Sequence, residues 1–363
     1  MTTLIVQKNA VVHNYNAIRQ ETGGIVIPVL KGNAYGLGDR EIAQLLAAEG
    51  VSFFAVARLE EARRLAEVLP DAEILLTTPY STEDAAEEIV GLSLTATVGS
   101  YDSAVLLNGI AEKHGVKCRV HFKFDTGMGR FGFLPQEAEK AVQAARYLKN
   151  LEVCGCFTHL SNCFGKDKKG VFRQYEQFRG CVETLRAAGI DPGITHIANS
   201  AAALLYPQLR LDAVRVGSAL LGRVSVKTKL DLIKVGRLES RVCEIRWLPA
   251  GHNIGYADTY RTKKPARIAV IPVGYADGLF TGKVRDTFRF RDVLRYGWQD
   301  FLSLFGRQRL SCCIGGKKVP ILGRVGLCNV VADVSDVPCD AGDAASFEVN
   351  PLLINANVDR TYV

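Results

Sequence analysis

Short apolar segments alternate with amphipathic segments through the first two-thirds of the chain, and this alternation limits the possible folds more than any other feature. The apolar segments have the length of β-strands, and those between them, such as REIAQLLAAEG and QEAEKAVQAARYL, show helical spacing. Strands are predicted at residues 25–31, 53–57, 74–77, 94–98, 118–125, 152–159, 195–199 and 213–217. Eight strands alternating with helices over about 220 residues predict an α/β fold, the (β/α)8 TIM barrel. A doubly wound open sheet is the alternative, but no GxGxxG motif follows the first strand.

The sequence changes character near residue 230. Segments such as ESRVCEIRWL, ARIAVIPVGYA and AASFEV are β-rich and are separated by Gly, Pro and Asp turns. We therefore expect a barrel over residues 1–230 and a C-terminal all-β domain over residues 231–363. Residues 281–310 interrupt the pattern with a basic, aromatic and partly helical segment. A solvated insertion is the simpler interpretation of that segment, and a partner-binding element is the alternative.

Charge and hydropathy argue against several classes of protein. Lys and Arg outnumber Asp and Glu by 45 to 38 without a long basic block, so nothing beyond net charge suggests nucleic-acid binding. No apolar run approaches the roughly 20 residues of a membrane span. The first residues also lack the pattern of a secretory signal. We expect a cytoplasmic protein that contacts neither nucleic acid nor membrane.

The cysteines do not show the spacing of a metal site. Ten are present, with neither a CxxC pair nor an HxxxH partner. Cys154 and Cys156 are two residues apart on a predicted strand, so their side chains are expected on the same side. We predict reduced, packed thiols and no bound metal.

Four predicted strands end in polar residues that a packed barrel does not require. They are Lys31, Lys123 together with Asp125, His159 and Arg215. The carboxyl ends of barrel strands meet at one face, where the chemistry of such barrels is found. Each residue alone is explained as well by structure, His159 as a core histidine and Lys31 as a lysine extending to solvent. Together they predict one site, in which a desolvated Lys31 amine acts as a nucleophile.

Longer motifs resemble those of one enzyme family. VLKGNAYGLG resembles the pyridoxal-phosphate lysine motif of the alanine racemase family, and KFDTGMGRFGF, CFTHLSN, HIANSAAAL, VRVGSALLG, GYADTY, VIPVGYADG and ILGRVGLCNVVADV follow in the family's order. The chain is identified as a member of this fold-type III family. The resemblance implies a barrel and a β domain, a homodimer with shared active sites, and pyridoxal 5'-phosphate as cofactor. It implies racemisation of alanine, which supplies D-alanine for peptidoglycan.

The resemblance also assigns roles to residues. Lys31 is expected to hold the cofactor as a Schiff base and to act as one acid/base group, with Tyr256 of the partner subunit as the other. Arg215 is expected to face the pyridine nitrogen and, because it keeps its proton, to leave that nitrogen unprotonated. His196 supports this arginine, and His159 packs against the cofactor ring.

Further residues are assigned to the substrate and the phosphate. Arg130 resembles the arginine that contacts the cofactor's phenolic oxygen and receives the substrate carboxylate. Lys123 aligns with a lysine that is carbamylated in many members and orients that arginine. Tyr275 resembles a tyrosine of the entrance corridor. The remaining residues, expected around the phosphate, are Tyr35, Ser200, Gly217 and Ser218.

The sequence departs from the family pattern at three places. RVGLCN replaces the usual RVCMDQ, so Leu327 and Cys328 replace a methionine and an aspartate that line the pocket from the partner's side. Ala356 stands where a tyrosine normally touches the phosphate, and residues 281–310 are expanded. A serine or broad-specificity racemase is therefore the close alternative. A decarboxylase of related architecture, a single-domain cofactor-binding protein and a catalytically inactive paralogue are more distant ones.

Overall fold

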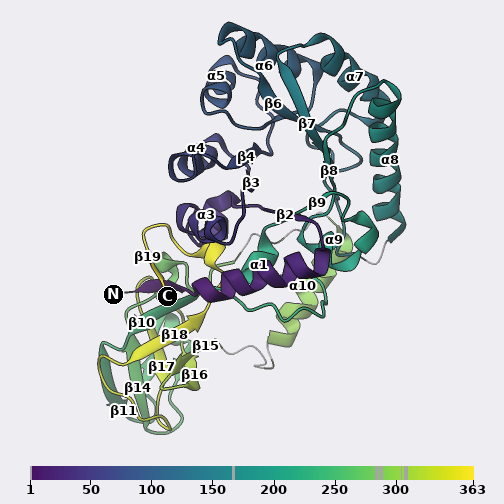
Figure 1. Ribbon diagram of the computed structural model, residues 1–363. Helices are drawn as coiled ribbons and strands as arrows, with labels where there is room; N and C mark the ends of the chain where they lie inside the picture. Colours follow the sequence, from purple (N-terminus) through teal and green to yellow (C-terminus); the bar gives the residue numbers. More distant parts are fainter. Residues whose placement is uncertain (1, 166–167, 283–284, 286–288, 304, 306–309) are drawn as a thin grey trace. The chain divides into compact units, whose positions relative to one another are not determined.

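The computed structural model describes residues 2–165, 168–282, 285, 289–303, 305 and 310–363. The chain divides into two compact units, one of Lys8–Val235 and one that combines Met1–Gln7 with Gly236–Val363 (Figure 1). The boundary lies five residues beyond the expected position. The first seven residues, which we expected in the barrel, belong to the β unit, because a strand within them pairs with strands of that unit.

The first unit is the predicted (β/α)8 barrel. Its eight parallel strands are β2 (Ile25–Pro28), β3 (Phe53–Val56), β4 (Glu73–Leu76), β5 (Ala96–Val98), β6 (Cys118–Lys123), β7 (Leu151–Phe157), β8 (Ile194–His196) and β9 (Ala213–Val216). Ladders join β2 to β9, β3 to β4, and β5 through β8 in order. Backbone hydrogen bonds close the remaining gaps, for example Leu30 N to Ala55 O at 2.8 Å and Arg215 N to Ala198 O at 2.9 Å.

The helices follow the strands as the periodicity predicts. They are α1 (Lys8–Thr22), α2 (Lys31–Gly36), α3 (Asp39–Ala48), α4 (Leu59–Val68), α5 (Glu83–Gly91), α6 (Tyr101–Lys113), α7 (Ala138–Tyr147), α8 (Lys168–Ala187) and α9 (Ser200–Leu205). Strands β3 and β9 are buried along their whole length, as expected for parallel strands covered on both faces. Every barrel strand except β5 ends before its predicted bound. Lys31 therefore begins α2, and His159 lies in the loop beyond β7.

The second unit is built on a nine-stranded sheet. Its strands are β1 (Thr3–Val6), β10 (Arg237–Arg241), β11 (Glu244–Leu248), β14 (Ala266–Ile271), β15 (Ser311–Ile314), β16 (Lys317–Leu322), β17 (Val330–Asp333), β18 (Ala344–Glu348) and β19 (Asp359–Tyr362). The order is β11-β14-β17-β16-β15-β18-β10-β1-β19. A short hairpin pairs β12 (Asn253–Ile254) with β13 (Tyr260–Arg261). The C-terminal all-β domain is thus confirmed, with β1 as an added strand.

One helix interrupts the β unit, α10 (Phe290–Ser303). It lies in the segment 281–310 that we expected to be partly helical. Residues 283–284, 286–288, 304 and 306–309 of that segment lie outside the described residues. No helix in the described part of the chain is long and apolar enough to cross a membrane.

Candidate functional site

A pocket opens at the carboxyl ends of the barrel strands. It collects residues from β6, β7 and β9 and from the segments that follow these and other barrel strands. Nine of the residues singled out from the sequence line it, namely Lys31, Tyr35, Lys123, Arg130, His159, Ser200, Arg215, Gly217 and Ser218. Four of these are basic, and among the described residues the lining includes no carboxylate. The pocket therefore suits a ligand with several negative groups.

Lys31 begins an unusual turn. The next four residues, Gly32 to Tyr35, have φ between 50° and 65° and form a left-handed turn. Each non-glycine residue in this conformation costs about 1–2 kcal/mol, so other contacts must hold the turn. The carboxylate of Glu61 accepts a hydrogen bond from the Gly32 N–H at 2.6 Å. It also accepts the N–H groups of Ala57 and Arg58 at 3.0 Å each.

The surroundings of Lys31 favour its neutral amine. Burial lowers the pKa of Lys31, and the positive charges of Arg130 and Arg215 lower it further, against a smaller opposite effect of Glu61. A larger neutral fraction makes the amine a better nucleophile. This environment is what a lysine that attacks an aldehyde requires.

Arg215 is held rigidly in the barrel interior. Its Nη1 donates to His196 Nδ1 at 2.6 Å and to the His196 carbonyl at 3.0 Å, and its Nη2 donates to the Thr158 carbonyl at 2.7 Å. The guanidinium also lies over the Phe157 ring, 5.0 Å from the centroid. Desolvation lowers the pKa of Arg215 to about 9, so the group stays largely protonated at neutral pH.

Two buried histidines, His196 and His121, extend the hydrogen-bond network of Arg215. Because Arg215 donates to His196 Nδ1, the hydrogen of neutral His196 lies on Nε2, which contacts His121 Nδ1 at 2.8 Å. Burial, together with the nearby positive charges, lowers the pKa of His121 to about 3 and holds the pKa of His196 well below its usual value, so both rings are neutral. His196 thus supports Arg215 from behind and does not line the pocket.

Lys123 is almost fully buried beside these groups. Its Nζ lies 4.8 Å from the centroid of the Phe157 ring and has no hydrogen-bonding partner among the described residues. Burial, with the charges of Arg215 and Arg130, lowers the pKa of Lys123 to about 7. An amine that is partly neutral at physiological pH is the form that reacts with carbon dioxide. The environment therefore fits the carbamylation that the resemblance implies.

Asp125 organises the TGMGR loop that carries Arg130. Its Oδ1 accepts the N–H groups of Gly127, Met128 and Gly129 at 2.8–3.0 Å, and its Oδ2 accepts that of Arg130 at 2.8 Å. Burial alone raises the pKa of Asp125, but the four N–H donors outweigh it and the pKa lies below the usual value. The loop is thereby fixed at the backbone while the Arg130 side chain remains exposed at the pocket.

The hydroxyl groups of Tyr35 and Ser200 lie beside the Gly217 backbone in another part of the pocket. A Cβ at Gly217 would lie 2.3 Å from the Tyr35 hydroxyl, so only glycine leaves room for that side chain. The Ser200 hydroxyl accepts the N–H groups of Gly217 at 3.1 Å and Ala219 at 3.4 Å. Burial raises the pKa of Tyr35 to about 12, so its hydroxyl keeps its hydrogen. Hydroxyl and amide donors of this kind suit a phosphate.

The other predicted residues lie in the β unit. Tyr256, Leu327 and Cys328 line one surface hollow. Tyr275 is tied to the same loop, since its N–H donates to the Gly326 carbonyl at 3.1 Å. Tyr256 is 72% exposed and Leu327 is 51% exposed. A hollow of exposed tyrosine and leucine side chains is typical of a surface that another molecule covers.

Ala356 lies in an exposed turn next to these residues in the β unit. The Asn355 side chain donates to the Ala276 carbonyl at 3.1 Å, directly after Tyr275. Ala356 offers no side-chain donor, as the sequence already implied.

Sequence reasoning missed three residues that shape the barrel site. Glu61 holds the Lys31 turn, Phe157 forms a wall under Lys123 and Arg215, and His121 extends the histidine pair. Glu61 lies in LEEARRLAEV, where two adjacent glutamates resemble the ordinary acidic first turn of a helix. His121 lies two residues before Lys123 on a strand, and that spacing was the one available signal that both point inward.

Known proteins with similar sequences and structures share one description. The chain matches the family model described as alanine racemase, N-terminal domain, over residues 6–224, and that described as alanine racemase, C-terminal domain, over residues 235–350. It is 32% identical to the alanine racemase of Methanococcus maripaludis, over 92% of this chain and 84% of that protein. The solved alanine racemase of Clostridium difficile 630 is 27% identical with a TM-score of 0.86, covering 100% of this chain and 95% of that one. That of Bacillus anthracis with bound L-Ala-P is 25% identical with a TM-score of 0.80, covering 100% and 95%.

Proposed function

The chain belongs to the alanine racemase family, and from this premise we propose that it interconverts L- and D-alanine with pyridoxal 5'-phosphate bound in the barrel pocket. The observation that carries this proposal is the pocket lining, which has four basic side chains and, among the described residues, no carboxylate. A phosphate and a substrate carboxylate are the negative groups it would hold. The Bacillus anthracis relative, solved with bound L-Ala-P, supports a small alanine-like ligand.

The residues of the pocket fit the cofactor. Lys31 supplies the amine for covalent attachment, and Tyr35 and Ser200 supply hydroxyl donors for the phosphate beside the backbone of Gly217 and Ser218. The clearance at Gly217, which a Cβ would fill, keeps the Tyr35 hydroxyl in place. When bound, pyridoxal phosphate withdraws electrons from an amino acid attached to it and so acidifies the α-hydrogen.

Arg215 controls the outcome once that hydrogen has been lost. We assign it to the pyridine nitrogen, as the family resemblance implies. A guanidinium fixed by His196 and Thr158 cannot give its proton to that nitrogen, so negative charge is not drawn fully into the ring. This favours return of a proton to the α-carbon over transamination. Arg130, on its ordered loop, would receive the substrate carboxylate.

Racemisation needs a base and an acid on opposite faces of the α-carbon. Lys31 is one, and we propose Tyr256 of the partner subunit as the other. The exposed position of Tyr256 in a hollow with Leu327 supports its insertion into a second copy. The protein would then act as a homodimer with shared sites, with Tyr275 at the entrance.

Serine is the second candidate substrate. Leu327 and Cys328 border the hollow beside Tyr256, and both differ from the family's usual methionine and aspartate. A change of one or two lining side chains shifts specificity by about 1–3 kcal/mol. This is enough to bring serine close to alanine without a change in mechanism.

The cellular setting follows from the chemistry. All ten cysteines are free thiols, which supports a reducing compartment such as the cytoplasm. D-Alanine made there would serve peptidoglycan synthesis.

The test is chiral chromatography of L-alanine and L-serine after incubation with the purified, cofactor-loaded protein. We expect alanine to approach an equal mixture of enantiomers faster than serine. Turnover of serine with alanine unchanged would refute alanine as substrate and retain the racemase. No turnover of either amino acid by protein that binds the cofactor would refute the proposed activity. Tyr256→Phe should slow proton exchange from one enantiomer more than from the other.

A further inference from the structure

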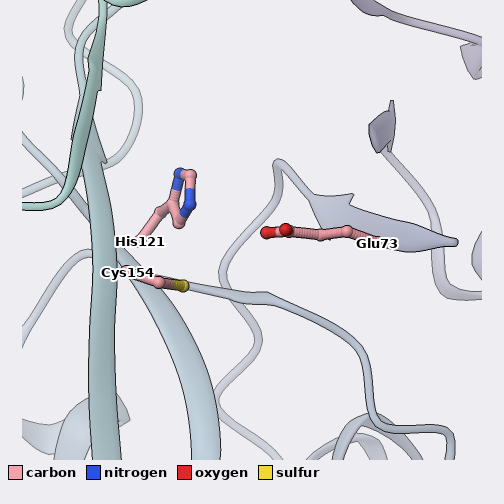
Figure 2. Close-up of side chains that lie close together, drawn as sticks. All are labelled: Glu73, His121 and Cys154. Atoms are coloured by element: carbon pink, nitrogen blue, oxygen red, sulfur yellow. The ribbon is translucent and has the colours of Figure 1, made fainter. Parts of the chain in front are cut away.

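A second group of reactive side chains lies inside the barrel, away from the pocket lining. Glu73 begins β4, His121 lies on β6 and Cys154 lies on β7. One ligand atom from each residue lies within 4.8 Å of the other two. Figure 2 shows the Glu73 carboxylate and the Cys154 sulfur directed toward the same space as the His121 imidazole. None of the three lines the pocket.

A β-bulge places Cys154 in this group. In the β6–β7 ladder, Val120 pairs with Val153 and His121 pairs with Gly155, so Cys154 is the extra residue. A bulge redirects the side chain of the residue it inserts. The expectation that Cys154 and Cys156 share one side is therefore wrong. Cys156 is fully buried in the environment of Cys181 on α8, whereas Cys154 lies with Glu73 and His121.

The imidazole of His121 has an unused nitrogen. Its Nδ1 contacts His196 at 2.8 Å, whereas its Nε2 is buried and has no hydrogen-bonding partner among the described residues. His121 has no exposed surface. A Cβ at Gly155 would lie 2.5 Å from Nε2, so the backbone of the bulged strand leaves just enough room for the ring. Buried nitrogens without partners are rare and call for a ligand.

We propose that Glu73, His121 and Cys154 bind a divalent transition metal, with Zn²⁺ as the best fit and water as the fourth ligand. Thiolate, imidazole and carboxylate are the three ligand types of protein zinc sites. Tetrahedral ligands at zinc bond lengths lie about 3.3–3.7 Å apart. The three side chains therefore need to close by about 1 Å, and we expect Glu73 and Cys154 to change rotamer when the metal binds.

The present partners of Glu73 do not block this site. Its Oε2 accepts Arg119 Nη2 at 3.0 Å, and its Oε1 accepts the Thr95 hydroxyl at 3.1 Å. The Arg119 side chain is 43% exposed, so it can turn to solvent when a cation takes its place. An ion pair with one partner largely in solvent is weak compared with a bond to a metal ion.

Metal binding has a consequence for Arg215. In the metal-free state Arg215 donates to His196 Nδ1, so His196 donates from Nε2 to His121 Nδ1, and the hydrogen of His121 lies on Nε2. A metal on Nε2 displaces that hydrogen and moves the His121 hydrogen to Nδ1. His196 then carries its own hydrogen on Nδ1, facing the Arg215 donor. The histidine pair keeps two hydrogens, and the Cys154 thiol releases one proton to solvent. The hydrogen bond from Arg215 Nη1 to His196 Nδ1 is lost, whereas the one to the His196 carbonyl remains.

Cobalt is the probe for the site. Co²⁺ added to the metal-free, cofactor-loaded protein should bind with one tight equivalent and give the near-ultraviolet absorption of a cobalt–thiolate bond, read as a difference spectrum. Cys154→Ser should remove this absorption and weaken binding about tenfold or more. Glu73→Gln should weaken it without removing the absorption. Cys243→Ser, at an exposed cysteine outside the cluster, is the matched control and should change neither.

Two results would overturn the proposal. One is the absence of cobalt–thiolate absorption in the unmodified protein. The other is the same absorption in Cys154→Ser, which would place the metal on another cysteine. The coupling to Arg215 has its own readout, because Zn²⁺ should shift the bound cofactor's visible spectrum in the unmodified protein and leave it unchanged in Cys154→Ser. Zinc binding with no spectral shift would refute that coupling. The cobalt measurement is independent of the proposed racemase activity.

Discussion

Glu61 offers a sharp test of how the site around Lys31 is held. Replacing it by glutamine keeps the shape of the side chain but exchanges one acceptor oxygen for an NH2 donor. The carboxylate now accepts three backbone N–H groups, those of Gly32, Ala57 and Arg58. In Glu61→Gln at least one of these donors faces another donor.

The expected cost follows from these contacts. Hydrogen bonds to a charged group contribute about 1.5–3 kcal/mol, and a buried donor without an acceptor costs about 1–3 kcal/mol. The left-handed turn after Lys31 has three non-glycine residues, each unfavourable by about 1–2 kcal/mol. The turn therefore depends on the hydrogen bonds that Glu61 accepts, and losing one of them should destabilise it directly. We expect Glu61→Gln to lower the free energy of unfolding of the barrel by about 2–4 kcal/mol. At roughly 2–4 °C per kcal/mol for a domain of this size, Tm falls by about 4–16 °C.

The measurement combines thermal unfolding with titration of the cofactor. Cofactor affinity should fall as well, because the turn that positions Lys31 is disordered more often. Glu60→Gln is the matched control, since Glu60 precedes it on the same helix and is exposed. If Glu61→Gln melted within a degree of the control and bound the cofactor equally well, the role given to this carboxylate would be refuted.

Two further predictions concern other parts of the pocket. Because N–H donors hold the pKa of Asp125 below its usual value, its stabilising effect is complete above about pH 4 and is lost as pH falls through the folded pKa. Asp125→Asn should therefore lower the free energy of unfolding by about 1–3 kcal/mol at pH 7, and denaturant titrations should show that gap closing below pH 4; a gap independent of pH would contradict this. Gly217→Ala should displace Tyr35 and weaken cofactor binding about tenfold while Tm changes little, and equal affinity in a spectroscopic titration would show that the close approach is not needed.

The fold was predictable because periodicity alone reveals it. The barrel strands are mostly buried, so they appear as short apolar runs, and helices such as α4 show one apolar face. Polar residues at the ends of these runs, such as Lys123 and Arg215, could be identified as candidate site residues from the strand pattern alone. The phosphate donors could not be identified in this way, because serine and glycine are common in ordinary turns. Ser200 and Gly217 were assigned through the family resemblance.

Other features depend on contacts that no local pattern encodes. Glu61 lies almost thirty residues from Gly32, to which it is bonded. The group of Glu73, His121 and Cys154 comes from three strands, and the bulge that turns Cys154 inward leaves no mark in the sequence. The role of Thr3–Val6 was missed because its partners lie more than 230 residues away.

That distant pairing has a bearing on biosynthesis. Strand β1 lies between β10 and the edge strand β19, so this edge of the sheet stays incomplete until residues 359–362 have left the ribosome. The barrel is contained in residues 8–235 and needs nothing made later for its own strands to close. We expect the barrel to fold during translation, while β1 stays unpaired until β10 (Arg237–Arg241) has been made and its second edge stays open until β19 follows. Stalled or truncated products would therefore combine a folded barrel with an exposed strand edge on β1, which makes them targets for chaperones and prone to aggregate.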